Sequence, residues 1–417
     1  MPPEFSIKSI DFIGTIDIWT RSFDFLLGRK RFVPPRLTAG PRFGAPRVNC
    51  PGCTAGDVAA FALGLAWVAA VCLSAVSTVV VPRGVPVRLT RIVFLTMRRL
   101  FELRSRFADT YAERDRAMAL YAPLTLIVLP VVWLALTLVG FTAMFWALGI
   151  RPLRAAFVTS GSSLLTLGFS RAPDLPTTVL AFSEAVLGLI LLALLITYLP
   201  SMYGAFSRRE HAVALVAIMA GSPPTPTEML TRFHTIRGLA QMELEVWRPW
   251  LDWFVDVEES HTSFAGLPFF RSPQPERSWI IAAGVVLDTA AIYASSLDVP
   301  RSPAAELSIR SGYIALRTIA DFYGIPYDPA PSPSDPISIS RDEYDAVYDQ
   351  LAGVGLPMRG DREQAWRDFA GWRVNYDTVL VIMAGFVMAP YAPWISDRSP
   401  ADRHRPPVVR RTPRRPR

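Results

Sequence analysis

Three long stretches with almost no charge dominate the hydrophobic pattern of this chain. They cover residues 58–82, 117–150 and 175–207, and Glu184 is the single charge among them. A helix rises 1.5 Å per residue, so about 20 apolar residues cross the roughly 30 Å of hydrocarbon in a bilayer. Each stretch is long enough to do so. The pattern therefore predicts an all-α membrane protein with three transmembrane helices, the first over residues 57–82.

The pattern changes after residue 207. A proline-rich stretch at 222–227 marks a boundary, and Trp247, Trp250 and Phe254 then recur at helical spacing, as expected for core positions. Asp288 argues against a span at 278–296, and no alternating strand pattern follows. The further helices we expect are 278–296, 303–323, 341–351, 361–376 and a buried one within 378–395, for which a fourth span is the alternative. The sequence predicts an all-helical C-terminal domain over residues 208–396.

Arginine placement predicts the orientation of the spans. Residues 83–119 form an Arg-rich amphipathic connector, and Arg208-Arg209 follow the third stretch. The positive-inside rule places both in the cytoplasm, together with the C-terminus of a multi-pass plasma-membrane protein. The side of the N-terminal polar segment 1–56 stays open, because its eight basic residues conflict with an outside position. The connector's arginines suit either an anionic lipid surface or a solvated helix face.

Composition narrows the function classes. Charged residues make up 19% of the chain, against roughly 25% in soluble proteins. The net charge of +7 equals the seven arginines of 403–417, within an expected disordered basic tail over 397–417, so a globally basic nucleic-acid binder is excluded. Cys50 and Cys53 have no second pair that would complete a zinc site, and no nucleophile, phosphate-loop or dinucleotide motif occurs. We expect no enzymatic activity, no cofactor and no nucleic-acid partner.

A shorter uncharged stretch lies between the second and third spans. Residues 155–170 are sixteen in number, too few to cross a membrane and return, and too apolar for an ordinary surface loop. A short helix that enters the membrane and an extended segment that leaves it would fit. Such a backbone is tolerated only where it is buried in protein or lines water.

The end of this stretch reads Ser163-Leu-Leu-Thr166-Leu167-Gly168-Phe169-Ser170, and it resembles the potassium-channel pore-loop family. In that family a span, a pore helix, a T-x-x-T-V-G-Y-G filter and a second span follow in this order. The resemblance covers roughly residues 120–210. It implies a pore domain over 120–207, with a pore loop at 152–171 and an inner helix at 177–206. It also implies a filter formed by Thr166, Leu167, Gly168, Phe169 and Ser170, a homotetramer in the lipid bilayer, and potassium as the permeant ion.

Several residues depart from the family pattern. Ser170 replaces a glycine, and Arg171 stands where the family has an acidic residue. A ring of arginines would repel cations, so Asp174 or Glu184 is expected to compensate at the pore mouth, with Glu184 behind the filter or in the outer vestibule. The cation channel is the first hypothesis, and Ser170 and Arg171 are the best support for the alternative, a non-conducting membrane receptor or scaffold that keeps the pore-loop fold.

The expected inner helix contains two residues that suit a gating hinge. Gly188 lets helices bend or approach closely, and Pro200 removes a backbone donor. Helix packing alone explains Gly188 equally well.

Overall fold

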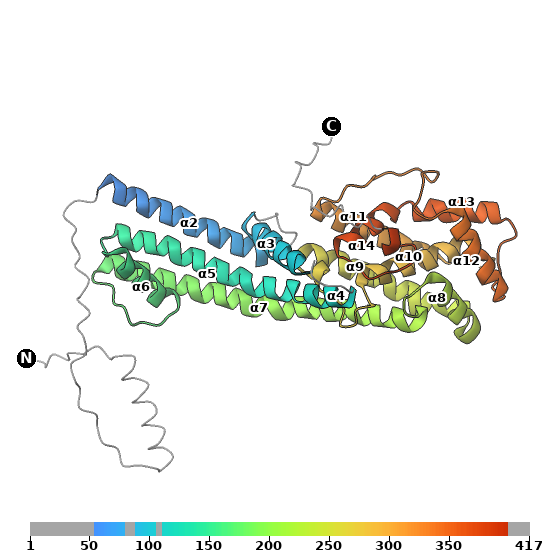
Figure 1. Cartoon of the computed structure of the whole chain (residues 1–417), viewed down its shortest axis with the longest axis horizontal. Coiled ribbons are helices and arrows are strands. Elements are labelled where there is room, and N and C mark those ends of the chain that lie inside the picture. Colours follow the sequence, from blue (N-terminus) through green and yellow to red (C-terminus); the bar gives the residue numbers. More distant parts are fainter. Residues whose placement is uncertain (1–53, 80–87, 106–110, 399–417) are drawn as a thin grey trace, which may run out of the picture.

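The computed structural model describes residues 54–79, 88–105 and 111–398. Most of the predicted N-terminal segment and nearly all of the basic tail therefore lie outside the described residues. All regular secondary structure in these ranges is helical, and one isolated antiparallel bridge joins Leu297 to Met358. Figure 1 shows a bundle of long helices that extends from a compact helical domain.

The first half of the chain forms the bundle and the connector beside it. Its helices are α2 (Ala55–Val79), α3 (Arg88–Ser105), α4 (Tyr111–Ala119), α5 (Tyr121–Ala147), α6 (Leu153–Leu164) and α7 (Leu175–Ala220). Helices α2 and α5 lie close together at two glycines. A Cβ on Gly64 would lie 2.7 Å from the carbonyl oxygen of Gly140, and one on Gly140 would lie 2.6 Å from Val68 Cγ2. Small residues allow such close packing of apolar helices.

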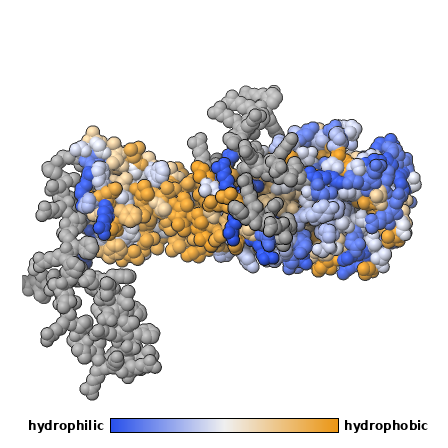
Figure 2. Space-filling view, viewed as in Figure 1, coloured by the Kyte–Doolittle hydropathy of each residue, from blue (hydrophilic) through white to orange (hydrophobic). Residues whose placement is uncertain are grey.

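Four described helices are long and apolar enough to cross a membrane, and they differ in how far the protein covers them. In α7 only 17% of the most apolar 18-residue stretch is buried inside the structure. The corresponding share is 28% in α2 and 44% in residues 115–147, which include α5. Helix α10 (Trp279–Ser296) is the fourth, but 94% of its stretch is buried. The apolar surface of the bundle is continuous in Figure 2, and polar residues bound it at both ends.

The second half of the chain forms the domain. Its longer helices are α8 (Pro226–Arg232), α9 (Arg248–Ser263), α10, α11 (Pro303–Tyr323), α12 (Arg341–Gly353), α13 (Arg362–Arg373) and α14 (Asp377–Phe386). Short turns of π- or 3₁₀-helix connect or follow them at Phe233–Arg237, Leu239–Gln241, Glu243–Trp247, Leu267–Phe269 and Ser396–Arg398. Trp247, Trp250 and Phe254 are at most 3% exposed, so their predicted place in the core is confirmed.

Local sequence explains where several domain helices begin and end. The Ser302 side chain accepts a hydrogen bond from the Ala305 N–H at the start of α11, and Ser340 forms a capping box with Glu343 at the start of α12. Such caps satisfy N–H groups that have no partner within the helix. Helix α11 is capped at its C-terminus by Gly324, which has φ of 68° in the left-handed region. Glycine adopts this conformation without a Cβ clash.

Helix α7 links the far end of the bundle to the domain. It was expected to end near residue 206, but it continues without a break to Ala220 and has 46 residues. The arginine pair did not end it, because both side chains find partners in the domain. Arg208 pairs with Asp256 at 3.0 Å, and the buried Arg209 donates to the carbonyl oxygen of Leu267 at 2.9 Å. The first predicted span differs little, since α2 begins two residues earlier than expected.

Candidate functional site

Helix α6 lies beside α7 at the end of the bundle farthest from the domain (Figure 1). Ser160 Oγ of α6 donates to Glu184 Oε1 of α7 at 2.5 Å. A Cβ on Gly188 would collide with the carbonyl oxygen of Leu164. The two contact residues of α6, Ser160 and Leu164, are four positions apart, and their partners on α7 follow in the same order at the same spacing. Helices α6 and α7 therefore run in the same direction. Gly188 lies 13 residues after the start of α7, which places the end of α6 about 20 Å along it.

The chain after α6 adopts an irregular conformation with alternating signs of φ. Leu165 has φ of −88°, Thr166 has 54°, Leu167 is not positive, and Gly168 has 71°. Glycine tolerates this region, but a β-branched threonine there is uncommon and costs on the order of 1–3 kcal/mol. Such a conformation persists only where surrounding contacts impose it.

Hydrogen bonds from the backbone N–H groups to the end of α6 impose this conformation. The Thr166 N–H donates to Ser163 O at 2.9 Å, and the N–H groups of Leu167 and Gly168 donate to Ser162 O at 2.8 and 3.3 Å. At the end of the segment, the Ser170 N–H donates to Ser162 Oγ at 3.0 Å. Residues 165–170 are therefore fixed to α6 by their backbone N–H groups.

The carbonyl groups of the same segment are not used in this way. Within the described ranges, no hydrogen bond is formed by the carbonyl oxygens of residues 165–169. The side chains of Leu165, Leu167 and Phe169 are 56%, 59% and 64% exposed, which is high for large apolar groups. The backbone N–H groups of this segment are thus mostly hydrogen-bonded to α6, whereas its carbonyl oxygens have no hydrogen-bond donor among the described residues. Backbone carbonyl oxygens without such donors can coordinate a cation.

Ser170 fits the place where the resembling family has a glycine. It is not among the residues with positive φ, so this position does not need glycine. Its hydroxyl lies 2.9 Å from the hydroxyl of Thr159 on α6. The serine therefore adds a second attachment between the segment and the helix.

Asp174 and Glu184, which were predicted to compensate the charge of Arg171, both have hydrogen-bond partners of their own. The Asp174 carboxylate accepts hydrogen bonds from the N–H and the hydroxyl of Thr177, so it serves as the N-cap of α7. Arg171 is exposed and makes no ion pair with any described residue. Arg151, in contrast, pairs with Asp57 at 2.8 Å.

Glu184 is buried where α7 contacts α6. Its side chain is 0% exposed, and Ser160 is the one described residue that hydrogen-bonds to it. The other oxygen, Oε2, has no hydrogen-bond partner in the described ranges. Of the two predicted hinge residues, Gly188 has a packing role against α6, and Pro200 lies within the continuous α7. Bending at either residue stays a prediction.

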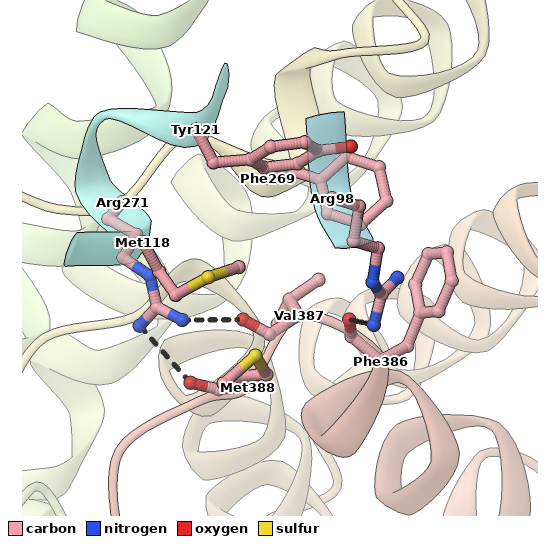
Figure 3. Close-up of a pocket in the computed structure, with 8 residues that line it drawn as sticks. All are labelled: Arg98, Met118, Tyr121, Phe269, Arg271, Phe386, Val387 and Met388. Atoms are coloured by element: carbon pink, nitrogen blue, oxygen red, sulfur yellow. Dashed lines mark hydrogen bonds between the residues drawn. The ribbon is translucent and has the colours of Figure 1, made fainter. Parts of the chain in front are cut away.

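Sequence reasoning missed a second cluster, which joins the connector to the domain. Figure 3 shows Arg98 of α3 and Arg271 reaching the end of α14 from two sides. Arg98 donates to the carbonyl oxygen of Phe386 at 3.4 Å, and Arg271 donates to that of Met388 at 3.2 Å. Arg271 also pairs with Asp115 of α4. The cavity between these side chains has room for about one water molecule, roughly 10 Å³, so it is a structural junction rather than a ligand pocket.

The described residues contain no group of three or more His, Cys, Asp or Glu that could hold a metal ion. No model of a known protein family matches the chain, and no curated protein or solved structure matches it either. Function is therefore inferred from the residues themselves.

Proposed function

We propose that this protein is a potassium-type cation channel that conducts passively, without a catalytic step or a cofactor. The observation that carries the proposal is the hydrogen bonding of residues 165–170. Their N–H groups donate to α6, and their carbonyl oxygens accept no hydrogen bond from the described residues. A permeant ion must exchange its water shell for oxygen ligands, and carbonyl groups on a backbone held in place by its N–H groups would supply them at little reorganisation cost.

One copy of the segment cannot surround an ion, so we propose a homotetramer. The large exposed fractions of Leu165, Leu167 and Phe169 support this, because neighbouring copies would cover them. Helix α7 has the least covered apolar surface of the four long helices, which leaves room for both neighbouring copies and lipid. The filter would then comprise Thr166, Leu167, Gly168, Phe169 and Ser170.

The orientation follows from charge. The arginines of α3 and the Arg208-Arg209 pair lie at the domain end of the bundle, so this end would face the cytoplasm of a plasma membrane. The segment 165–170 would then enter from the outside. About 20 Å of α7 between its start and the end of α6 is consistent with a loop that penetrates part of a roughly 30 Å core.

Arg171 favours a second candidate, a non-conducting receptor or scaffold with the same fold. Four exposed arginines around a narrow mouth would oppose the entry of cations. Under this alternative the tetramer would assemble, and the helical domain would bind a partner.

Potassium flux into liposomes that contain the purified full-length protein tests the proposal. We expect flux in the wild type and none in Gly168→Asp, because Gly168 has φ of 71° and lies in the proposed filter. The matched control is Gly324→Asp. Gly324 has φ of 68°, and an added Cβ there, as on Gly168, would have no atom within 4 Å, but Gly324 lies in the domain. Equal flux in wild type and Gly168→Asp would reject the filter assignment.

The mass of the purified protein in detergent is the second measurement. Four copies of 46.2 kDa are expected. A stable monomer or dimer is incompatible with a channel that has one loop per chain. A stable tetramer without flux would favour the receptor or scaffold.

A further inference from the structure

Helix α3 has an inward and an outward face. Val93 and Arg98 are 7% and 6% exposed and face the bundle and the domain. Ile92, Leu100 and Leu103 are 60%, 57% and 54% exposed. These three positions recur at helical spacing, so they form one apolar stripe on the outward face, which we call the α3 stripe.

Helix α3 carries arginines beside the α3 stripe, and it has few acidic residues that could neutralise their charge. Five arginines and a single acid, Glu102, lie within α3. Glu102 pairs with the inward-facing Arg98 at 2.7 Å. Arg99 and Arg104 are exposed and make no ion pair with any described residue. The outward face is therefore apolar and positively charged at once.

The α3 stripe lies where the apolar surface of the bundle ends. A hydrogen bond of 2.7 Å joins the hydroxyls of Thr78 near the end of α2 and Thr90 near the start of α3. In Figure 1, α3 lies between the long helices and the domain, and in Figure 2 the apolar surface ends at this level. A membrane that covers the bundle would therefore have its headgroup region beside α3.

We propose that the α3 stripe, with Arg99 and Arg104, lies in the surface of a membrane and binds anionic lipid headgroups. Three large apolar side chains enter the boundary between headgroups and acyl chains, and the two guanidinium groups contact phosphate oxygens. Charge complementarity and continuity with the apolar surface of the bundle favour this occupant over a neighbouring copy of the chain. The proposal does not require the protein to conduct ions.

The structure divides the arginines of α3 between two roles, which the sequence pattern alone could not do. Arg98 points inward to Phe386 O, and its guanidinium lies 5.8 and 5.2 Å from the ring centres of Phe269 and Phe386. Arg98 therefore holds α3 against the domain. Arg99, the next residue, is directed outward and is available to lipid.

A fluorescent probe at the α3 stripe tests the apolar part of the proposal. The full-length protein, with Cys50→Ser, Cys53→Ser and Cys72→Ala as background, is labelled with bimane at Ile92→Cys and placed in vesicles containing brominated phosphatidylcholine. We expect strong quenching by the brominated lipid. The control is Ile236→Cys, because Ile236 is an isoleucine of similar exposure, 75%, in the domain. It should be quenched by aqueous iodide and not by the lipid.

Two arginine variants test the anionic part. The apparent affinity of the Ile92→Cys probe for vesicle phosphatidylglycerol should fall roughly fivefold in Arg99→Gln, since one arginine near an anionic surface contributes about that factor. Arg310→Gln should leave it unchanged, because Arg310 is an exposed helix arginine of the domain that also makes no ion pair with a described residue.

Three results would overturn the proposal. Lipid quenching at residue 92 no stronger than at residue 236 would place the α3 stripe in water. A probe shielded from both lipid and iodide, together with disulfide cross-linking between copies through Ile92→Cys, would show that a neighbouring chain covers it. Equal phosphatidylglycerol dependence in Arg99→Gln and Arg310→Gln would remove the headgroup contact.

Discussion

Helices α7 and α10 are similar in sequence terms but have opposite environments. Each is long and apolar, and each carries one fully buried acid and one glycine at a close approach. In α10, Asp288 accepts hydrogen bonds from Arg373 and Tyr376. In α7, Glu184 meets only the hydroxyl of Ser160 among the described residues.

The two helices differ in how the buried acid is neutralised and in how far the chain covers the apolar surface. The domain neutralises its buried acid within the chain, since Arg373 contacts both Asp288 and Asp377. Burial opposes the charge of Arg373, but the two carboxylates outweigh it and raise its pKa above the usual value. Helix α7 has no such cation beside Glu184 among the described residues and leaves most of its apolar surface uncovered. It is therefore a helix whose surroundings lie largely outside one copy of the chain.

The largest expected effect of a substitution is in the α10 cluster. Arg373→Met leaves Asp288 and Asp377 buried without their cation, which should cost about 3–5 kcal/mol of unfolding free energy. Denaturant unfolding followed by circular dichroism measures it. The double variant Arg373→Met with Asp288→Leu removes one of the two stranded charges and should recover part of the loss. If the double variant is no more stable than the single one, charge pairing is not what stabilises this cluster.

A matched pair of glycine substitutions gives the next largest effect. A Cβ on Gly284 would lie 2.7 Å from Ile395 Cδ1 and 2.9 Å from Leu380 Cδ2, which are the ends of side chains in the core. Overpacking of this kind typically costs about 1–3 kcal/mol, and Gly284→Ala should lower stability without altering flux. In Gly188→Ala the new Cβ meets the backbone of Leu164 instead, so it should displace the end of α6 and reduce potassium flux in liposomes. Unchanged flux in Gly188→Ala would show that conduction does not depend on the contact between Gly188 and Leu164.

Sequence alone was sufficient for the helical class and for many helix boundaries, because apolar length and caps are local properties. Residues 303–323 were expected as a helix and form α11 with those bounds. The end of α7 was not predictable, since Arg208 and Arg209 end an apolar stretch in the sequence but are paired by residues about 50 positions away.

The candidate site was predictable in part. The short helix before residue 165 follows from the apolar stretch, and Gly168 indicates a special backbone. The attachment of Ser170 to Thr159 and Ser162 depends on tertiary packing, and so does the use of Asp174 as a helix cap. Sequence spacing does not predict the attachment of Ser170 or the capping by Asp174.

The junction between α7 and the domain should make stability depend on pH. His261 is fully buried, and its Nε2 lies 3.3 Å from Arg209 Nη1. The guanidinium can only donate, so Nε2 accepts and Nδ1 carries the proton, near Ser260 Oγ at 3.2 Å. Glu210, which pairs with Arg209, is the other charged group here, and the Trp279 ring of α10 packs against the imidazole.

Burial, and then the charge of Arg209, lower the pKa of His261 well below its usual value. The unfolded chain therefore binds this proton at a higher pH than the folded one. Stability should fall as the pH drops below about 6.5, by at most about 1.4 kcal/mol per pH unit. Unfolding measured from pH 7.5 to 5 should show this slope in the wild type and a shallower one in His261→Gln. Parallel slopes would show that the pKa of His261 is not lowered in the folded protein relative to the unfolded chain.

The smallest expected effect comes from the acid of α7, and it tests the comparison of the two helices most directly. Glu184→Gln keeps an oxygen that can accept from Ser160 and strands no cation, so stability should change by about 1 kcal/mol or less. Asp288→Asn is the matched substitution in α10. It weakens the pairing of a buried arginine and should cost several times more, on the order of 3 kcal/mol. Unfolding in the same detergent compares the two. A loss in Glu184→Gln as large as that in Asp288→Asn would mean that Glu184 is also paired with a cation, which would have to come from outside the described residues of one copy.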